Sequence, residues 1–401
     1  MNAHIALLKK NKTLLLLSSI QLICYFGAWF SHMAIYSLIS KDYLVAPEWV
    51  ITAVAILTFL PTMILAPFSG VIVDKVPTKP LMITLLFIEI ITVLMLLLIT
   101  SLEWIWLLLI LVFIRMGVGS TYFQTEMSLL PKILNANDLK IANEIHSIIW
   151  SLSYTAGMGL AGFYVFAFGV KSAFIADAVL FSIGLILLIR LKIPSLIKRK
   201  TENAFKMLKD GLIYLKTNRK VLHLILLHAC VGFSTYDALV SLLANNIYLK
   251  VLAVPLTLGF INSIRALSLT LGSVVLSKFI NEKNMHIFFI LQGVGIITWA
   301  LLQFNFYIAF IGVVLAGFFT STLWAFTYTL LQRETNPAFY GRVVAYNDMF
   351  IMGVSVLTSF VIGLLHQNGV ALYLITALLG VMFILTAFYF LWFRKNYYKK
   401  G

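Results

Sequence analysis

The chain has 401 residues, of which 61% are hydrophobic and 11% charged, and its formal net charge is +15 at pH 7. So little polar surface cannot cover a water-soluble globule of this size, which excludes soluble enzymes and binding domains and indicates a membrane protein. The surplus of Lys and Arg would suggest nucleic-acid binding in a soluble protein. In a membrane protein its distribution reports orientation, and no nucleic-acid partner is expected.

Apolar runs long enough to cross a hydrocarbon core about 30 Å thick follow one another along the chain. They are continuously apolar, unlike the alternating segments of an outer-membrane barrel, so each predicts a transmembrane helix. The first run is too long for a signal-peptide core and no cleavage pattern follows it, so it is predicted to be the first span. The twelve runs are Leu14–Ser40, Trp49–Ile72, Leu81–Thr100, Trp104–Met127, Ala142–Phe168, Ala173–Arg190, Val221–Ile247, Pro255–Ile280, Ile287–Gln303, Phe306–Leu331, Val343–His366 and Ala371–Phe393.

The longest polar stretch separates the first six runs from the last six. It predicts an N-terminal six-helix half at 1–191, a cytoplasmic linker at 192–220 and a C-terminal six-helix half at 221–401. Apolar residues recur at helical spacing between the lysines of the linker, which favours an amphipathic helix at the membrane interface. We interpret this segment as a solvated linker that is attracted to anionic lipids, in preference to a segment with a regulatory role. The recurring residues are Phe205, Leu208, Leu212 and Leu215.

A short internal repeat favours two related halves. Four residues near the end of the fourth run recur at a constant offset in the tenth, as parallel six-helix repeats predict. Ser120, Thr121, Leu129 and Leu130 recur as Ser321, Thr322, Leu330 and Leu331.

Most of the 30 Lys and Arg residues lie in the two termini, the linker and alternate loops. The positive-inside rule therefore predicts that both termini are cytoplasmic, in a multi-pass protein of the bacterial inner membrane. Lys41, Lys171 and Lys250 fall on the other side. Arg115 and Arg265 are left within the membrane.

The loop after the second run reads Gly70-Val-Ile-Val-Asp74-Lys75-Val-Pro-Thr-Lys79. It resembles the loop motif of the major facilitator superfamily, with proline at position 77 where the family has a second glycine. A small residue lets two helix ends approach, and an acid with bases can form a charge network that holds a gate shut. The resemblance implies that Gly70, Asp74, Lys75 and Lys79 form a cytoplasmic gate.

The fourth run contains Leu111-Val-Phe-Ile-Arg115-Met-Gly-Val-Gly119, which is similar to a second motif of that superfamily. The fifth contains Gly157-Met-Gly-Leu-Ala-Gly162, without the proline typical of the superfamily's exporters. Further matches resemble the branch that holds macrolide and enterobactin exporters. They are Leu130-Pro131, Leu139, Ala142-Asn143, Phe174-Ile-Ala-Asp177-Ala and Gly341-Arg342-Val343.

The resemblance implies an all-α fold of twelve spans in two halves that rock around one central site, commonly driven by protons. It also implies that the third, sixth, ninth and twelfth spans lie outside the other eight. Ionisable groups within a membrane are costly, so they are functional candidates. Arg115 and Glu126 share a helix face with Tyr122. Arg115 and Tyr122 are interpreted as substrate contacts. The alternative for Arg115 is a structural role. Glu126 is interpreted as an acid that acts in gating or in proton coupling.

Asp237 in the seventh run and Arg265 in the eighth are expected at similar depth. Such a pair could act as a proton-linked switch, because protonating the acid removes the attraction. A static neutral pair is the equal alternative. Glu89 and Asp177 fall in spans expected to be peripheral, where hydrogen bonds that pack helices are favoured.

Along the first run an aromatic and polar stripe recurs every three or four residues, which suits a bulky amphiphilic or aromatic ligand. It comprises Gln21, Tyr25, Trp29, His32 and Tyr36, although Tyr36 also fits a membrane interface. The fifth run repeats the pattern in His146, Trp150 and Tyr154. From these residues Gln21, Tyr25, Trp29, His32, Trp150 and Tyr154 are predicted to contact substrate.

The sequence favours a transporter that exports a drug, siderophore or related metabolite in exchange for protons. Uptake or translocation of a lysophospholipid or metabolite is the alternative. No nucleophile elbow, phosphate loop or ligand cluster predicts an enzyme, a metal site or a cofactor. Cys24 and Cys230 stand alone in separate runs, so no disulfide is expected. The expected partners are a small-molecule substrate, protons and membrane lipids, around a monomer.

Overall fold

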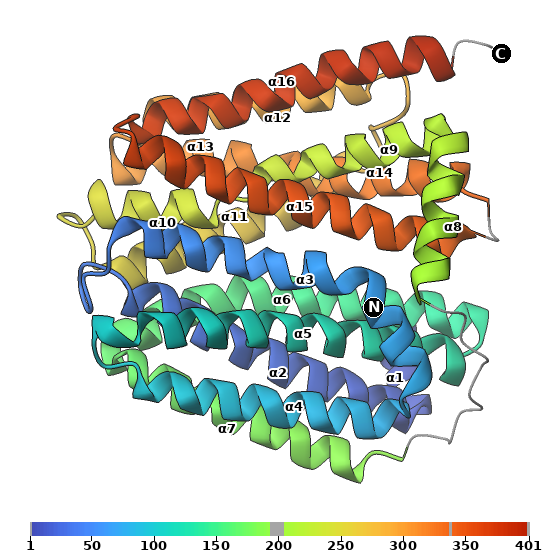
Figure 1. Cartoon of the computed structure of the whole chain (residues 1–401), viewed down its shortest axis with the longest axis horizontal. Coiled ribbons are helices and arrows are strands. Elements are labelled where there is room, and N and C mark those ends of the chain that lie inside the picture. Colours follow the sequence, from blue (N-terminus) through green and yellow to red (C-terminus); the bar gives the residue numbers. More distant parts are fainter. Residues whose placement is uncertain (1, 193–203, 337–338, 399–401) are drawn as a thin grey trace.

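The computed structural model describes residues 2–192, 204–336 and 339–398, and these residues are helical almost throughout (Figure 1). Within them, twelve helical segments are long and apolar enough to cross a membrane. Each overlaps one of the apolar runs, so the predicted all-α fold of twelve transmembrane helices is confirmed. In the N-terminal half the spans are α2 (Lys12–Leu38), α3 (Glu48–Lys75), α4 (Thr78–Met95), α5 (Ile105–Ile133), α6 (Ala136–Phe168) and α7 (Val170–Arg190).

In the C-terminal half two of the six spans are each built from two helices in line. The helices are α9 (Arg219–Ala229) with α10 (Asp237–Asn246), α11 (Val254–Leu276), α12 (Met285–Leu302), α13 (Phe306–Phe318) with α14 (Thr320–Glu334), α15 (Tyr340–Gln367) and α16 (Leu372–Tyr397). A short helix α1 (Asn2–Lys10) precedes the first span, and the linker contains α8 (Ala204–Thr217). In Figure 1 helices α2 to α7 fill the lower part and α9 to α16 the upper part.

Helix α8 stands across the direction of the spans in Figure 1, close to the ends of α9 and α15. Of the apolar residues predicted to form its buried face, Leu215 is 3% exposed and Leu212 is 47% exposed. The side chains of Phe205 and Leu208 lie outside the described part of the chain. We call the end of the bundle with α1 and α8 the linker end, and the opposite end, with the loops that follow α2 and α10, the far end.

The local sequence explains where several helices begin and end. The side chains of Asn11 and Asn135 cap the first turns of α2 and α6, where they accept backbone N–H groups that have no helical partner. Gly169 joins α6 to α7 with a φ of 84°, a conformation that side chains with a Cβ rarely adopt. The chain can therefore reverse at the far end within a single residue.

The seventh span is not the continuous helix that its apolar run predicts. A 3₁₀ segment, Cys230–Ser234, separates α9 from α10, and Thr235 after it is extended. Gly232 lies so close to α15 that an added Cβ would meet the Ile351 carbonyl oxygen at 3.0 Å. The break frees the Ser234 carbonyl and places Asp237 in the first turn of α10.

The two halves meet along two helix pairs, α3 with α15 and α6 with α11. Near the far end α6 and α11 nearly touch, because an added Cβ on Gly162 would lie 2.5 Å from the Pro255 carbonyl oxygen. The Ser263 hydroxyl donates to the Thr155 carbonyl at 3.0 Å across the same pair. Helices that approach this closely leave no space through which a ligand could pass between them.

Polar contacts close the far end further. Lys41 donates through its backbone N–H to Asn245 at 2.9 Å and through its ammonium to Asn246 at 2.6 Å. Asp42 accepts the Val254 N–H, at the start of α11, at 2.7 Å. His366 of α15 lies 2.9 Å from the Glu48 carboxylate of α3. The structure is therefore sealed between its halves at the far end.

Candidate functional site

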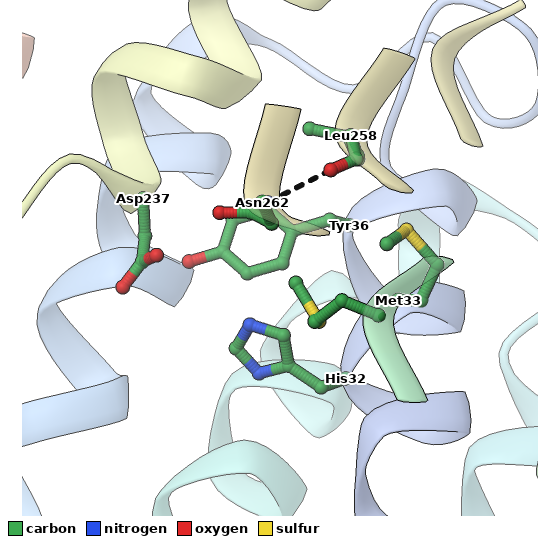
Figure 2. A pocket seen from close by; sticks show the side chains of 7 residues that line it. His32, Met33, Tyr36, Asp237, Leu258 and Asn262 are labelled. Carbon is green, nitrogen blue, oxygen red and sulfur yellow. Dashed lines mark hydrogen bonds between the residues drawn. The ribbon is translucent and has the colours of Figure 1, made fainter. Parts of the chain in front are cut away.

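Residues from both halves converge on a small cavity in the part of the bundle near the sealed far end. Its volume is about 10 Å³, which is room for about one water molecule. The N-terminal half contributes through α2 and α6, and the C-terminal half through α10 and α11 (Figure 2). The lining residues are His32, Met33, Tyr36, Met158, Asp237, Leu258 and Asn262.

Asp237 and Arg265, paired in the sequence analysis by depth, are brought together here. The Arg265 Nη1 lies 4.0 Å from the Asp237 Oδ1, which is too long for a hydrogen bond and leaves an electrostatic pair. Arg265 Nη2 instead donates to the freed Ser234 carbonyl at 3.0 Å, and its guanidinium lies 4.8 Å from the Tyr236 ring centre. Arg265 is thus anchored by the break in the seventh span, whereas Asp237 is held loosely.

Asp237 faces polar groups of the other half. In Figure 2 the Tyr36 hydroxyl points toward its carboxylate, and the His32 ring lies below the Tyr36 ring. Both side chains lie close enough to Asp237 for the charge of its carboxylate to act on them. The Asn262 amide donates to the Leu258 carbonyl at 3.0 Å, and its Oδ1 has no hydrogen-bond partner among the described residues. The cavity therefore offers an acid and a free amide acceptor to a ligand.

The aromatic stripe on α2 continues onto α6. Ring centres of Trp29 and Tyr154 lie 4.6 Å apart, those of Trp29 and His32 5.7 Å, and those of Trp150 and Tyr154 5.3 Å. An added Cβ on Gly157 would lie 2.6 Å from the Trp29 ring, so this glycine makes room for the indole. Tyr154 is also within electrostatic range of Arg265. Four predicted substrate contacts, Trp29, His32, Trp150 and Tyr154, thus form one aromatic wall next to the charged pair.

Gln21 and Tyr25 lie in a separate cluster nearer the linker end. Gln21 contacts the His146 ring, and the Tyr25 and His146 ring centres are 6.1 Å apart. Tyr122 and Glu126 of α5 are buried beside them, within electrostatic range of Tyr25. The Tyr122 hydroxyl and the Glu126 Oε2 have no hydrogen-bond partner among the described residues. Nothing in the spacing of these residues distinguishes this cluster from the aromatic wall, because both lie along the same stripe of α2.

Arg115 does not face the cavity in this structure. It is 2% exposed inside the N-terminal half, with its Nη2 2.8 Å from Asp177 and its Nε 3.8 Å from Glu89. The shared face predicted for Arg115, Tyr122 and Glu126 therefore points into the helix bundle, and the substrate role of Arg115 stays a prediction. Asp177 accepts a hydrogen bond from Arg115 that joins α7 to α5, as expected of an acid that packs helices, whereas Glu89 lies 3.8 Å from Arg115 and makes an ion pair without a hydrogen bond.

Of the predicted gate, Gly70, Asp74 and Lys75 lie in the last turns of α3, but their side chains are outside the described part of the chain. The Lys79 ammonium donates to the Ile189 carbonyl at 2.8 Å, at the end of α7. A cation at a helix C-terminus is favourable, so Lys79 ties the start of α4 to α7. The gating role of all four residues stays a prediction.

Four residues beside the charged pair were not predicted from the sequence: Asn262, Met33, Met158 and Tyr236. Asn262 could have been found, because it precedes Arg265 by three residues and so shares its helix face. The two methionines carry no signal in a chain with 13 of them. Among the described residues no group of three or more His, Cys, Asp or Glu side chains could hold a metal ion.

Comparisons with known proteins agree with this architecture. The family model described as Major Facilitator Superfamily matches residues 17–311. A curated relative, the proposed bacilysin exporter BacE of Bacillus subtilis (strain 168), is 25% identical over 178 residues, which is 44% of this chain and 44% of that protein. The aligned stretch thus spans less than half of the relative.

Several solved structures share the fold at low sequence identity. The nucleoside transporter NupG has a TM-score of 0.72 at 16% identity, covering 96% of this chain and 100% of that one. The POT family transporter PepTSo has a TM-score of 0.78 at 11% identity, covering 97% and 99%. A bacterial homologue of the iron transporter ferroportin, in an inward-facing state, has a TM-score of 0.71 at 15% identity, covering 94% and 98%.

Proposed function

The chain belongs to the major facilitator superfamily, and from that premise we propose that it exports an amphiphilic small molecule in exchange for protons, by alternating access. The observation that carries the proposal is the loose pair of Asp237 and Arg265 where the two halves meet. An acid at the junction of two moving halves is charged when it has released its proton and neutral when it has bound one. If the charged and neutral forms favour different arrangements of the halves, binding a proton changes which arrangement is populated.

The proposed substrate class follows from the side chains around the pair. The Trp29, Trp150 and Tyr154 rings offer apolar area with polar edges. Asn262 and Asp237 offer acceptors at one end of that wall. A drug, siderophore or metabolite with a flat apolar part and a hydrogen-bond donor group suits both the rings and the acceptors. The export direction is supported by the resemblance to BacE.

We place the linker end in the cytoplasm of a bacterium, in the inner membrane, because most of the 30 Lys and Arg residues lie at that end. The sealed far end then faces outward. The halves 1–191 and 221–401 would rock about the cavity while the linker 192–220 stays on the cytoplasmic surface. We propose that the protein acts as a monomer, because a single chain supplies both halves of the site.

Uptake or translocation of a lysophospholipid or another anionic metabolite is the second candidate. It is favoured by Arg265, a partly exposed cation (14% of its side chain) beside the cavity. The two candidates differ in the charge of the ligand that should stabilise the protein. A thermal-shift screen of purified protein against drugs, siderophores and lysolipids separates them, and flux of the hits in proteoliposomes then gives the direction.

Replacing Trp29 with Ala should weaken ligand binding roughly tenfold, because the indole is the centre of the aromatic wall. Tyr25→Ala should have a smaller effect, since Tyr25 lies in the cluster nearer the linker end. The measurement is ligand-induced stabilisation across a concentration series. Trp106→Ala, at a 67% exposed indole far from the wall, is the matched control. An unchanged affinity in Trp29→Ala would mean that this wall does not touch the ligand.

Replacing Asp74 with Asn should slow turnover and leave substrate affinity largely intact, because the proposed loop network acts on the gate and not on the ligand. Transport rate and ligand-induced stabilisation are measured on the same preparation. Lys192→Gln, at a linker lysine outside the motif, is the control. Equal rates for Asp74→Asn and the parent protein in proteoliposomes would reject the gate.

A further inference from the structure

A second group of ionisable side chains lies inside the N-terminal half, away from the cavity. Arg115 of α5 stands between two acids, Asp177 of α7 and Glu89 of α4, at 2.8 Å and 3.8 Å. The exposed fractions of the three residues are 2%, 0% and 4%. The Arg115 Nη1 and the Glu89 Oε2 have no hydrogen-bond partner among the described residues. The proposed function uses none of the three.

The charges of this cluster do not balance. Two ionised carboxylates around one guanidinium leave a net charge of −1 at a site without water access, and a net buried charge in a membrane costs several kcal/mol. Among the described residues the cluster has no ion-pairing cation besides Arg115. The neighbouring groups are Cys24 and Ser31 of α2, the Phe181 ring of α7 at 5.7 Å, and His32, which faces Asp237 on the other side of α2. None of them supplies the missing positive charge.

We propose that the cluster of Glu89, Arg115 and Asp177 is a proton-binding site that holds one proton, on Glu89. Asp177 is the ionised partner because it accepts the short, charge-assisted bond from Arg115. Glu89 lies farther from Arg115, at 3.8 Å and without a hydrogen bond, and so gains less from ionising than Asp177 does. With the proton on Glu89 the cluster is neutral, and its burial no longer carries the cost of a net charge.

The cluster also contacts α2, the helix that contributes Trp29 and His32 to the aromatic wall. An added Cβ on Gly27 of α2 would lie 2.6 Å from the Asp177 Oδ1. At about 100° per residue, Gly27 and Ser31 lie on the face of α2 opposite Trp29, His32 and Tyr36. A shift of α2 on ligand binding would therefore change the space around Asp177. This link to transport rests on the proposed function, whereas the bound proton does not.

Infrared difference spectroscopy of purified protein tests the proton directly, because a protonated carboxyl has a carbonyl stretch that an ionised one lacks. In Glu89→Gln one such band should disappear at neutral pH, since the remaining Asp177 balances Arg115. In Asp177→Asn one band should also disappear, because Glu89 must then ionise to pair with Arg115. Glu103→Gln, at an exposed acid outside the cluster, is the matched control and should lose none.

Thermal stability assigns the proton to one acid. Glu89→Gln copies a protonated Glu89, so its Tm should stay within about 2 °C of the parent, whereas Asp177→Asn should lower the Tm by roughly 5 °C or more. The opposite order would overturn the assignment to Glu89. Spectra of Glu89→Gln and Asp177→Asn that keep every carboxyl band would overturn the bound proton. Neither outcome depends on transport, so a failure of proton-driven export remains a separate result.

Discussion

Replacing Asp237 with Asn should abolish transport driven by a pH gradient and preserve downhill exchange of substrate. Asn keeps the size and hydrogen-bonding capacity of the side chain but cannot take up or release a proton. The acid lies 4.0 Å from Arg265, at a junction where its charge can favour one arrangement of the halves. Substrate exchange without a gradient needs only binding and rocking, which the amide permits.

The measurement is substrate flux in proteoliposomes with and without an imposed proton gradient, together with exchange at equal pH. Asp237→Glu, which keeps a titratable group, should retain part of the response, and Glu103→Gln should retain all of it. If Asp237→Asn still responds fully to the gradient, the proton is carried elsewhere. Glu126, the surroundings of Arg115 and His32 are then the groups to test next.

The sequence was sufficient to predict the features that depend on the length of a helix and on how deep a residue lies in the membrane. Apolar runs predict the spans because the bilayer sets how many residues a crossing needs. Asp237 and Arg265 were paired correctly because the rise of a helix fixes how deep each residue lies. Trp29 and Tyr154 were both selected by their periodicity, and their contact follows from the packing of α2 against α6.

Features that depend on the rotation of helices about their axes were not predictable. Arg115, Glu89 and Asp177 were each identified as buried ionisable groups, but nothing in their spacing says that three separate helices turn them toward one another. The break at Cys230–Ser234 was missed because the run around it is apolar and long enough overall to predict one unbroken span. It depends on tertiary contacts, from Gly232 to α15 and from Arg265 to Ser234.

Replacing Gly162 with Ala should shift the protein strongly toward states in which the far end is open, and slow transport in consequence. The added Cβ would lie 2.5 Å from the Pro255 carbonyl oxygen and 2.9 Å from the Gly259 Cα. Both are backbone atoms, so the clash can be relieved only if α6 and α11 move apart. Overpacking of this kind costs about 1 to 3 kcal/mol, which corresponds to a roughly 5- to 150-fold change in the ratio of closed to open states.

Labelling of a cysteine at Ser263 with a membrane-impermeant maleimide reports the opening, because Ser263 faces Thr155 across the sealed pair of helices. The label should react slowly in the Ser263→Cys parent and faster once Gly162→Ala is added, with Cys24 and Cys230 replaced in both. Gly341→Ala is the matched control, since an added Cβ there meets no atom within 4 Å. Equal labelling rates in Gly162→Ala and Gly341→Ala would show that α6 and α11 absorb the extra methyl group without parting. The close approach at Gly162 would then not be what keeps the far end shut.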